Sequence, residues 1–582
     1  MKILLVAINA KYIHSNLAVY SLRAYAKKNI SNGDPEIEIA EYTINQQQDE
    51  ILRDIYEKKA DVVCFSCYIW NLSYVEALVC ELGKICPDSD IWMGGPEVSY
   101  DAKKVLERLW TVKGVMMGEG ERTFWELCEK YTNVGTGEQK ESGINDTDLE
   151  AIEGITFRRA DGSIRENSWR KPMDLSEVPF VYDDMSEFEN KIIYYETSRG
   201  CPFSCSYCLS SIDKRLRFRN LELVKKELQF FLDNHVAQVK FVDRTFNCKH
   251  EHAMTIWRYI MEHDNGVTNF HFEISADLLN EEELKLIEKM RPGLIQLEIG
   301  VQSTNQSTIR EIKRTMNFAK LSETVSRIRE MKNVHQHLDL IAGLPYEDKE
   351  SFVKSFDDVY ALKPHQLQLG FLKVLKGSYM EEKSDDYGLV YKSTPPYEVL
   401  YTKWLSYEDV LELKGIEEMV EVYYNSRQFE HTLKALEQEY LSAYELYREL
   451  WIYYKSGNLL GILHKRSARY EILLSFISDS DRLKSKKQYF RELLIYDYYL
   501  RENAKTRPAF AGENALGKDE IRSFYENEEK EHTFLKNYEK YDKNQMRKMT
   551  HLEYFPTLNK TVLFDYMQRN PLNQEARNLV VK

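Results

Sequence analysis

The chain has 582 residues, of which 43% are hydrophobic and 12% aromatic, so it can bury sizeable cores; this excludes a disordered chain and predicts two to four domains. Its net charge of −14 argues against broad nonspecific binding to nucleic acid, and no DNA partner is expected. Nine cysteines without a secretion signal favour a reducing, cytoplasmic setting, and the absence of a long apolar run predicts no membrane span.

The first 130 residues alternate between short apolar runs and helical periodicity. Apolar runs of this length read as buried parallel strands, and each is followed by a helical stretch. Five such units predict an α/β domain with a doubly wound, Rossmann-like sheet over residues 1–135. The predicted strands are Ile3–Ile8, Ile37–Ala40, Val62–Ser66, Ile91–Met93 and Val115–Met117.

Residues 136–184 have the composition of a connecting segment. The polar stretch Thr132–Glu150 is rich in Gly, Asn, Thr and Glu and predicts a loop. The Asp161-Gly162 pair lies between two strand patterns, Gly154–Arg159 and Ser163–Asn167, which predicts a β-hairpin. The segment is therefore expected to be a linker that contains one hairpin.

A second series of six strand and helix patterns occupies residues 185–376. Six repeats in this length predict a partial (β/α)6 barrel of the TIM type rather than a closed barrel of eight. Loops that follow barrel strands build active sites, so these loops are the candidate positions for functional residues. The predicted strands are Ile192–Thr197, Val239–Asp243, Phe270–Ser275, Leu294–Val301, His337–Ala342 and Gln366–Leu372.

Residues 377–582 show long stretches of helical periodicity that are rich in Tyr, Leu and Glu. Near the end, Met549–Phe555 and Leu558–Tyr566 predict one pair of strands around Pro556. The region has no clustered Cys or His and no glycine loop at a strand end. We therefore expect a mainly helical domain that governs substrate access rather than cofactor chemistry.

Three cysteines in one short loop, Cys201, Cys205 and Cys208, follow the first predicted barrel strand. About 0.002 such triplets are expected by chance in this composition. Three thiolates can hold one metal centre and leave one position open, as in a [4Fe–4S] cluster with one free iron. The alternative is a structural zinc site with a fourth ligand from Cys248, His250 or His252.

The loop and its setting resemble the radical S-adenosylmethionine (SAM) enzymes, whose signature is this CxxxCxxC spacing. The resemblance covers roughly residues 182–376. It implies that Cys201, Cys205 and Cys208 hold a [4Fe–4S] cluster whose free iron binds SAM, and that one electron then releases a 5′-deoxyadenosyl radical. It further implies that Tyr207 lies beside the adenine and that a flavodoxin- or ferredoxin-type protein is the one-electron reductant.

Polar residues occupy the ends of the third and fourth barrel strands. Glu273 and Ser275 share one strand face, and so do Glu298 and Gln302, because side chains alternate with period two. A carboxylate inside a barrel needs a partner, so SAM or a substrate group is one candidate. The alternative is an internal salt bridge with Arg244, Arg199 or Lys240.

The family resemblance implies three further SAM contacts. Asp243, at the end of the second strand, matches the position that binds the SAM amino group, although the usual Gly-Gly-Glu motif is absent and a helix N-cap is the alternative role. EIGVQS followed by Arg314 is similar to the oxygen-independent coproporphyrinogen oxidase branch, which implies a contact of Arg314 with the SAM carboxylate. Ile341, before Gly343-Leu344-Pro345, would contact the adenine.

Two glycine segments end the fourth and fifth strands of the N-terminal domain: Gly94-Gly95-Pro96 and Gly118-Glu119-Gly120. Glycines there allow a ligand close to the backbone. With the early HSNLAVYSL, they resemble the cobalamin-binding domain fused ahead of many radical SAM domains. The Asp-x-His-x-x-Gly motif with its cobalt-binding histidine is absent from the loop at Asn9–Asn16, so a sheet that only braces the barrel is the alternative.

These observations predict a cobalamin-dependent radical SAM enzyme that modifies, and by analogy methylates, an unactivated carbon of an unknown substrate. One alternative is a methylthiotransferase-like enzyme, which would need cysteines for a second cluster in the N-terminal domain. The other is a non-catalytic sensor in which the cluster and cobalamin report redox state.

Overall fold

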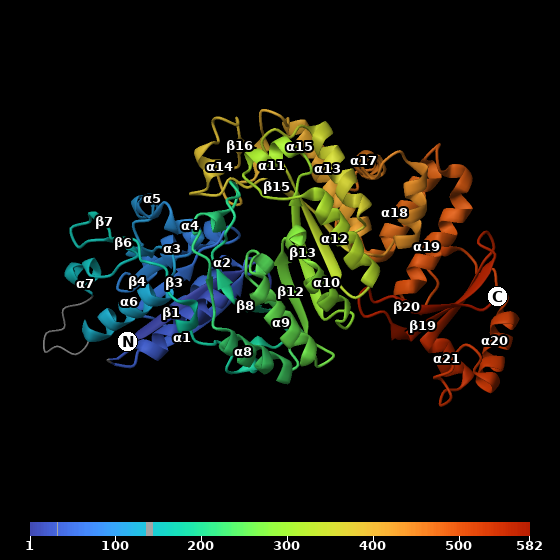
Figure 1. The fold of residues 1–582 in the computed structure, drawn as a ribbon, viewed down its shortest axis with the longest axis horizontal. Helices are drawn as coiled ribbons and strands as arrows, with labels where there is room; N and C mark the ends of the chain where they lie inside the picture. Colours follow the sequence, from blue (N-terminus) through green and yellow to red (C-terminus); the bar gives the residue numbers. More distant parts are fainter. Residues whose placement is uncertain (32, 135–143) are drawn as a thin grey trace.

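A computed structural model describes residues 1–31, 33–134 and 144–582. The chain forms three parts arranged in a row along the longest axis of the molecule: an N-terminal sheet domain, a central half-barrel and a C-terminal helical part (Figure 1). The α/β fold class predicted from the sequence is confirmed. Part of the predicted loop at 132–150 lies outside the described residues; on either side of that gap, helix α6 runs to Val134 and a short helix, α7, forms at Asp146–Glu150.

The N-terminal sheet has the strand order β2-β1-β3-β4-β5-β6-β7, and its first five strands are parallel. Alternate side chains of β1 enter two separate cores, because neighbouring residues of a strand point to opposite faces. One core packs against α1 and α6 and the other against α2, α3 and α5, which makes the sheet doubly wound. The elements are β1 Lys2–Asn9, α1 Leu17–Asn29, β2 Glu36–Thr43, α2 Gln48–Glu57, β3 Val62–Ser66, α3 Leu72–Ile85, β4 Asp90–Gly94, α4 Pro96–Ser99, α5 Ala102–Arg108, β5 Gly114–Met116 and α6 Glu121–Val134.

The hairpin predicted within the connecting segment forms, as β6 Ile155–Arg158 and β7 Ile164–Glu166. It does not stand apart as a linker, because β6 pairs antiparallel with β5 and extends the N-terminal sheet by two strands. Ile155 and Phe157 are fully buried on the face that α6 covers. The apolar residues of the hairpin therefore anchor it to the domain that precedes it.

The central half-barrel is a parallel sheet of six strands in the order β15-β14-β13-β12-β11-β8. Its helices cover the outer face, and β8 does not pair with β15, so the barrel is open (Figure 1). The elements are β8 Ile193–Tyr195, α8 Leu221–Asp233, β11 Gln238–Phe241, α9 His250–Glu262, β12 Asn269–Ile274, α10 Glu281–Glu288, β13 Ile295–Gln302, α11 Gln306–Glu311, α12 Phe318–Met331, β14 His335–Ala342, α13 Lys349–Ala361 and β15 Gln366–Phe371.

Strand β13 shows why the inside of this barrel is polar. Its odd-numbered residues, Ile295 to Val301, are fully buried against the outer helices, whereas Glu298, Gly300 and Gln302 face inward and are half-buried. The neighbouring β14 places Asp339 on the same inner face. TIM barrels normally fill this space with branched aliphatic side chains. The polar interior therefore indicates space used for a ligand.

The two flanking parts cover both free edges of the half-barrel. At the β8 edge, His14 from the loop after β1 forms a parallel bridge with Ile192, and the Ser15 hydroxyl donates to the Ile192 carbonyl at 3.0 Å. At the β15 edge, the Asn425 side chain accepts from the Leu367 N–H and donates to the Leu367 carbonyl, both at 2.9 Å. An edge strand with unpaired backbone groups can form hydrogen bonds with a strand of another chain. Both contacts therefore protect the half-barrel against aggregation through its edges.

The C-terminal part is mainly helical and ends in a three-stranded antiparallel sheet, β18-β19-β20. The first two strands match the predicted pair, and β20 is additional. Within the described residues, no helix has both the length and the apolar character needed to cross a membrane. The elements are α14 Tyr379–Glu382, β16 Val390–Tyr391, β17 Val399–Tyr401, α15 Tyr407–Met419 with a π-helical turn at Val420–Asn425, α16 Glu430–Leu436, α17 Ala443–Ser456, α18 Arg466–Asp479, α19 Lys487–Arg501, α20 Lys518–Glu531, α21 Lys543–Met549, β18 Thr550–Phe555, β19 Lys560–Arg569 and β20 Ala576–Val580.

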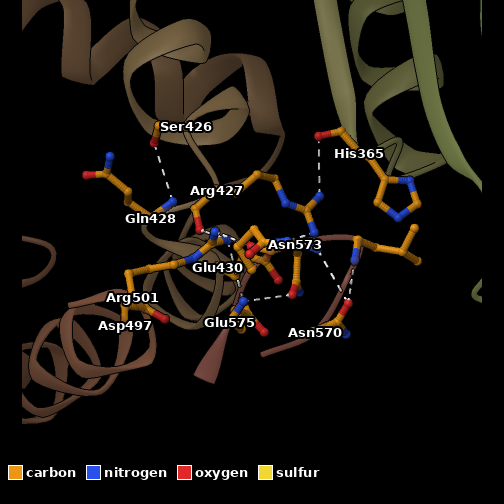
Figure 2. A network of polar contacts seen from close by, with 12 residues as sticks. His365, Ser426, Arg427, Gln428, Glu430, Asp497, Arg501, Asn570, Asn573 and Glu575 are labelled. Atoms are coloured by element: carbon orange, nitrogen blue, oxygen red, sulfur yellow. Dashed lines mark hydrogen bonds and ion pairs between the residues drawn. The ribbon is translucent and has the colours of Figure 1, made fainter. Parts of the chain in front are cut away.

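A polar network ties this part to the half-barrel (Figure 2). Arg427 donates to the carbonyl of His365, which precedes β15, at 3.3 Å, and forms an ion pair with Glu430 of α16. Arg501 of α19 donates to the Arg427 carbonyl at 2.6 Å and lies 3.6 Å from Glu575, just before β20. The network thus links the barrel, two helices and the final sheet.

One buried carboxyl of the barrel predicts a pH-dependent stability. Glu347 is 1% exposed and accepts hydrogen bonds from Ser303 and Ser355, and burial raises its pKa to about 7. In the unfolded chain the carboxyl group of Glu347 has its ordinary pKa of about 4.5, so the folded state binds this proton more tightly. The resulting contribution to the free energy of unfolding, about 3 kcal/mol, is complete below pH ~4.5 and is lost by pH ~7. Thermal unfolding of Glu347→Gln should therefore depend less on pH across that window. Glu350→Gln, at an exposed glutamate, is the control, and identical pH profiles for all three proteins would contradict the assignment.

Candidate functional site

A cavity of about 190 Å³ opens at the carboxyl ends of the barrel strands. The cysteine loop forms one wall, and the inner faces of β12, β13 and β14 form the others. The structure thus brings together most of the residues that the sequence singles out on the barrel. Those that line the cavity are Cys201, Cys205, Tyr207, Cys208, Glu273, Ser275, Gln302 and Arg314.

The cysteine loop is held from three sides. Gly200, at φ +92°, turns the chain into the loop where a Cβ would lie 2.6 Å from the Arg215 carbonyl oxygen. The Ser206 N–H donates to the Ile312 carbonyl at 2.9 Å, and the Ser206 carbonyl accepts from the Met380 N–H at 3.0 Å. The loop therefore has a defined shape that depends on both barrel and C-terminal residues.

The spacing of the three thiols bears on the choice of metal. Their sulfur atoms do not all lie within 4.8 Å of one another. A tetrahedral zinc site holds its sulfurs about 3.8 Å apart, since each Zn–S bond is about 2.3 Å. The wider arrangement fits the larger [4Fe–4S] cluster.

The residues considered as a fourth zinc ligand have other surroundings. His250 lies 3.1 Å from Glu283, and His252 lies 3.0 Å from the Thr197 hydroxyl. Burial lowers the pKa of His252 to about 4 and raises the pKa of the Cys248 thiol to about 11. These contacts engage both histidine rings away from the thiols, which favours the interpretation with three ligands.

Arg314 places a cation beside the cysteine loop. Its Nη1 lies 3.3 Å from the Tyr207 hydroxyl and 3.8 Å from the Cys205 sulfur, and its Nη2 donates to the Gly300 carbonyl. Burial alone would lower the pKa of Arg314, but Tyr207 and Cys205 outweigh that effect and raise it. A fixed positive charge at the open side of a cluster site suits a carboxylate ligand.

The strand ends supply uncharged and weakly acidic groups to the cavity. Gln302 has φ +73° at a register shift in β13, and its side-chain oxygen is buried without a hydrogen-bond partner. Burial raises the pKa of Glu273 to about 7. The Ser275 hydroxyl donates to Asp277 at 2.7 Å. The side-chain oxygen of Gln302 therefore lacks a partner, and Gln302 and Glu273 can receive hydroxyl or amino groups.

Asp243 and Ile341 do not line the cavity. Asp243 is fully buried, and its carboxylate accepts from the Thr197 N–H at 2.9 Å and from the hydroxyls of Thr197 and Ser198 at 2.6 Å. Burial raises its pKa to about 6. With its oxygens engaged just ahead of the cysteine loop, Asp243 braces that loop, and a direct contact of this carboxylate with SAM is not supported.

Several lining residues were not assigned to the site from the sequence, among them Arg244, Thr245 and Asp339. Arg244 and Thr245 follow β11, and Glu298 and Asp339 lie on the inner faces of β13 and β14. Asp339 shares its strand face with Ile341 and His337, so period-two alternation could have identified it. Arg244 was considered only as the partner of a salt bridge, whereas Glu298 was a candidate for a contact with SAM or a substrate group.

The glycine segments of the N-terminal domain lie at the carboxyl edge of its sheet. Gly95, at φ +115°, passes so close to Cys67 that a Cβ would lie 2.4 Å from the Cys67 carbonyl oxygen. Pro96 begins α4, and Gly118 lies under the ring of Trp169. Gly120 borders Leu22 of α1. These glycines therefore let the loops at this edge pack closely against neighbouring segments of the domain.

Glu119 differs from its glycine neighbours because it joins the two domains. Its carboxylate lies 2.6 Å from Arg217 and 3.5 Å from Arg199, which flank the cysteine loop. It also accepts from the Met173 N–H at 3.2 Å. Glu119 thus holds the sheet edge against the cysteine loop, and its acid group is not free for a ligand.

Exposed aromatic side chains gather at the same sheet edge. They belong to loops that follow β1, β3, β4 and β7, whose carboxyl ends point the same way. Trp70 stacks on Tyr68 with ring centroids 4.4 Å apart, and Tyr100 lies 5.9 Å from Trp169. Large exposed apolar patches commonly mark ligand or partner surfaces. The exposed members are Tyr12, Ile13, Trp70, Tyr100 and Trp169.

The histidine in the Asn9–Asn16 loop is already bonded. His14 Nδ1 lies 2.6 Å from the hydroxyl of Tyr194 on β8, and burial lowers its pKa. The His14 ring therefore serves the contact between the domains. This loop presents Tyr12 and Ile13 to solvent.

Three protein-family models match the chain in succession. The B12 binding domain matches residues 3–128 and the radical SAM superfamily matches residues 195–359. The third model, a protein of unknown function (DUF4080), matches residues 385–575. The order agrees with the resemblance drawn from the sequence.

Two curated relatives are about a quarter identical to this chain over the aligned residues, which cover about half of each protein. An uncharacterised methyltransferase of Pyrococcus horikoshii is 24% identical over 286 residues, which is 46% of this chain and 58% of that protein. The cobalamin-dependent radical SAM methyltransferase TokK of Streptomyces tokunonensis is 24% identical over 356 residues, 56% of this chain and 49% of that protein. The chain thus spans about half the length of these relatives.

A solved structure shares the fold of the first two domains. The radical SAM methyltransferase TsrM of Kitasatospora setae, with cobalamin and a [4Fe–4S] cluster bound, superposes with a TM-score of 0.53 at 16% identity. The match covers 68% of this chain and 82% of that protein. A radical SAM domain implies a [4Fe–4S] cluster and SAM, and a B12 domain implies cobalamin. The chain therefore carries a radical SAM domain, with a B12-binding domain before it and a DUF4080 domain after it.

Proposed function

We propose that this protein is a cobalamin-dependent radical SAM methyltransferase that acts on an unactivated carbon. The observation that carries the proposal is the ion pairing of Glu119 with Arg199 and Arg217. It holds the glycine edge of the B12 domain directly against the cysteine loop of the barrel. Both cofactors would then border one reaction space, as transfer of a methyl group to a substrate radical requires.

Each cavity residue has a role in this proposal. The three cysteines would hold the cluster, and Arg314 would pair with the carboxylate of SAM, as the resemblance implies. Gln302 and Glu273 would receive hydroxyl or amino groups of SAM, because both line the cavity and the side-chain oxygen of Gln302 lacks a hydrogen-bond partner. When bound, the cluster supplies one electron to SAM and the corrinoid supplies the methyl group.

The corrin ring would lie between the two domains, on the aromatic sheet edge. Trp70 and Trp169 offer exposed apolar rings at this edge, and Gly95 and Gly118 let its loops pack closely against Cys67 and Trp169. A bound corrin would cover this apolar surface and so account for its exposure.

Two alternatives predict different properties. A methylthiotransferase-like enzyme would need a second cluster in the N-terminal domain, yet Cys64 and Cys67 are buried among apolar side chains, which raises the pKa of both thiols. The C-terminal three-stranded sheet also differs from the small β-barrel expected for such enzymes. A redox sensor would need no cavity beside the cysteine loop.

The decisive experiment is anaerobic reduction of the reconstituted protein with SAM that carries a deuterated methyl group, in the presence of a cell extract. We expect 5′-deoxyadenosine and a metabolite that has gained the labelled methyl group, detected by mass spectrometry. About four irons per chain with methyl transfer supports the proposal. About eight irons with methylthio transfer would favour the first alternative, and absence of SAM cleavage would favour the sensor.

Arg314 provides a test of the SAM orientation. Arg314→Met removes a charge-assisted contact of about 1.5–3 kcal/mol, so SAM should bind roughly 10- to 150-fold more weakly. Equilibrium dialysis with SAM at full cluster occupancy measures this. Arg314→Lys, which keeps the charge, should lose less, and Arg310→Met on α11 should change nothing. Equal affinity for SAM in the unaltered protein and the three variants would show that Arg314 does not contact SAM.

A further inference from the structure

A second cluster of ligand-type side chains lies on the inner wall of the barrel, on strands β13 and β14. One oxygen of Glu298, one ring nitrogen of His337 and one oxygen of Asp339 all lie within 4.8 Å of one another. Glu298 and His337 are paired across the two strands, and Asp339 lies two residues further along the same strand face. The cluster includes none of the three cysteines.

Two atoms of this cluster are buried without a hydrogen-bond partner. His337 Nε2 and Asp339 Oδ1 lie 3.0 Å apart but are not aligned for a hydrogen bond. Only 8% of the His337 side chain is exposed. Nearby, His271 Nε2 is also without an aligned partner, 2.9 Å from Glu298 Oε2. Buried polar atoms are nearly always satisfied, so several that converge on one point indicate an absent ligand.

We propose that Glu298, His337 and Asp339 bind a divalent transition-metal ion, with Zn²⁺ as the ion that fits this donor set. Imidazole nitrogen with carboxylate oxygen suits Zn²⁺, and three protein ligands leave a fourth position open. Glu298 and Asp339 also line the cavity, so the open position faces whatever fills it. The ion would therefore be able to bind a hydroxyl or carboxylate oxygen of a ligand in the cavity.

A neighbouring cation offers the competing explanation. Lys240 Nζ lies 3.1 Å from Glu298 Oε2, so the same side chains could form a closed ion-pair network without metal. In that case Lys240 neutralises Glu298, and His337 pairs with Asp339 at 3.0 Å. The two arrangements differ in what happens when Lys240 is removed.

The test uses the full chain, whose cluster is reconstituted under anaerobic conditions. The reconstituted protein is then dialysed against Zn²⁺. We expect about one zinc per chain in addition to the iron, with only nitrogen and oxygen neighbours at about 2.0–2.2 Å in zinc-edge X-ray absorption. His337→Ala and Asp339→Asn should each weaken zinc binding by 100-fold or more. His335→Gln changes a histidine on the same strand outside the cluster and should leave it intact.

Lys240→Met separates the two explanations. If zinc binds, removal of the competing ammonium should tighten binding by tenfold or more, whereas an ion-pair network predicts a less stable protein that still takes up no zinc. Less than 0.1 zinc per chain in the unaltered protein, or sulfur neighbours at about 2.3 Å, would overturn the proposal. Iron content and SAM cleavage are measured separately. A negative result for zinc binding would therefore not contradict the proposed methyl transfer.

Discussion

Replacing any one of Cys201, Cys205 and Cys208 by alanine is expected to abolish both cluster binding and reductive cleavage of SAM. The loop supplies three thiolates and no fourth, so loss of one leaves too few ligands to hold the cluster. Iron should fall from about four atoms per chain to a small fraction of one, with loss of the broad visible absorbance. Production of 5′-deoxyadenosine should fall below detection. Iron analysis, absorption spectra and chromatography of the products measure these changes.

Cys248→Ala is the matched control, because Cys248 lies on the loop after β11, next to the cysteine loop. Its thiol is half-buried and lies outside the CxxxCxxC loop, so it is not expected to be a ligand. This variant should keep full iron content and SAM cleavage. One equivalent of zinc in place of iron after anaerobic reconstitution, lost in Cys248→Ala, would instead establish the structural zinc site.

The second large effect is expected at the aromatic edge of the N-terminal sheet. Trp70→Ala and Trp169→Ala should each weaken binding of hydroxocobalamin by roughly 5- to 30-fold, since each half-exposed ring would lose about 1–2 kcal/mol of burial against the corrin. The double variant should lose roughly 30-fold or more. Titration monitored by the corrin absorbance gives the affinities.

Trp110→Ala is the control for these variants. Trp110 is 67% exposed and follows α5, at the opposite edge of the sheet, so its loss should not change the affinity. Because His14 is bonded to Tyr194, the Co(II) form should show no nitrogen superhyperfine splitting from a protein histidine in electron paramagnetic resonance. Clear splitting that disappears in His14→Ala would show that this histidine turns to the cobalt.

Much of the fold could be predicted from periodicity, because inner strands of the N-terminal sheet are apolar runs and several barrel strands alternate apolar with polar residues. The two sheets, the hairpin at Asp161-Gly162 and the pair β18 and β19 were all expected from such patterns. Strand β20 was missed because Ala576–Val580 has three exposed residues and carries almost no burial signal. Pairing with β19 alone makes it a strand.

The site was predictable only in part, because its residues are fixed by contacts distant in the sequence. The cysteine loop was identified by spacing alone. Asp243 lies at the strand end where the family resemblance expects a SAM contact, yet Thr197 and Ser198 occupy its oxygens, which no local pattern reveals. The contact from Met380 to Ser206 likewise joins the predicted helical domain to the cysteine loop. The boundary expected near residue 376 therefore separates residues that act together.

The covered edges of the half-barrel have a consequence for how the protein is made. Ribosomes add about 5–20 residues per second, and domains tend to fold as they emerge. The loop that covers β8 is synthesised before the barrel, but the cover for β15 comes from Asn425, well after that strand ends at Phe371. During that interval the nascent barrel exposes an unpaired edge to other chains. Ribosomes stalled between these positions should accordingly hold a nascent chain that recruits chaperones, and this should cease once residues 407–425 have emerged.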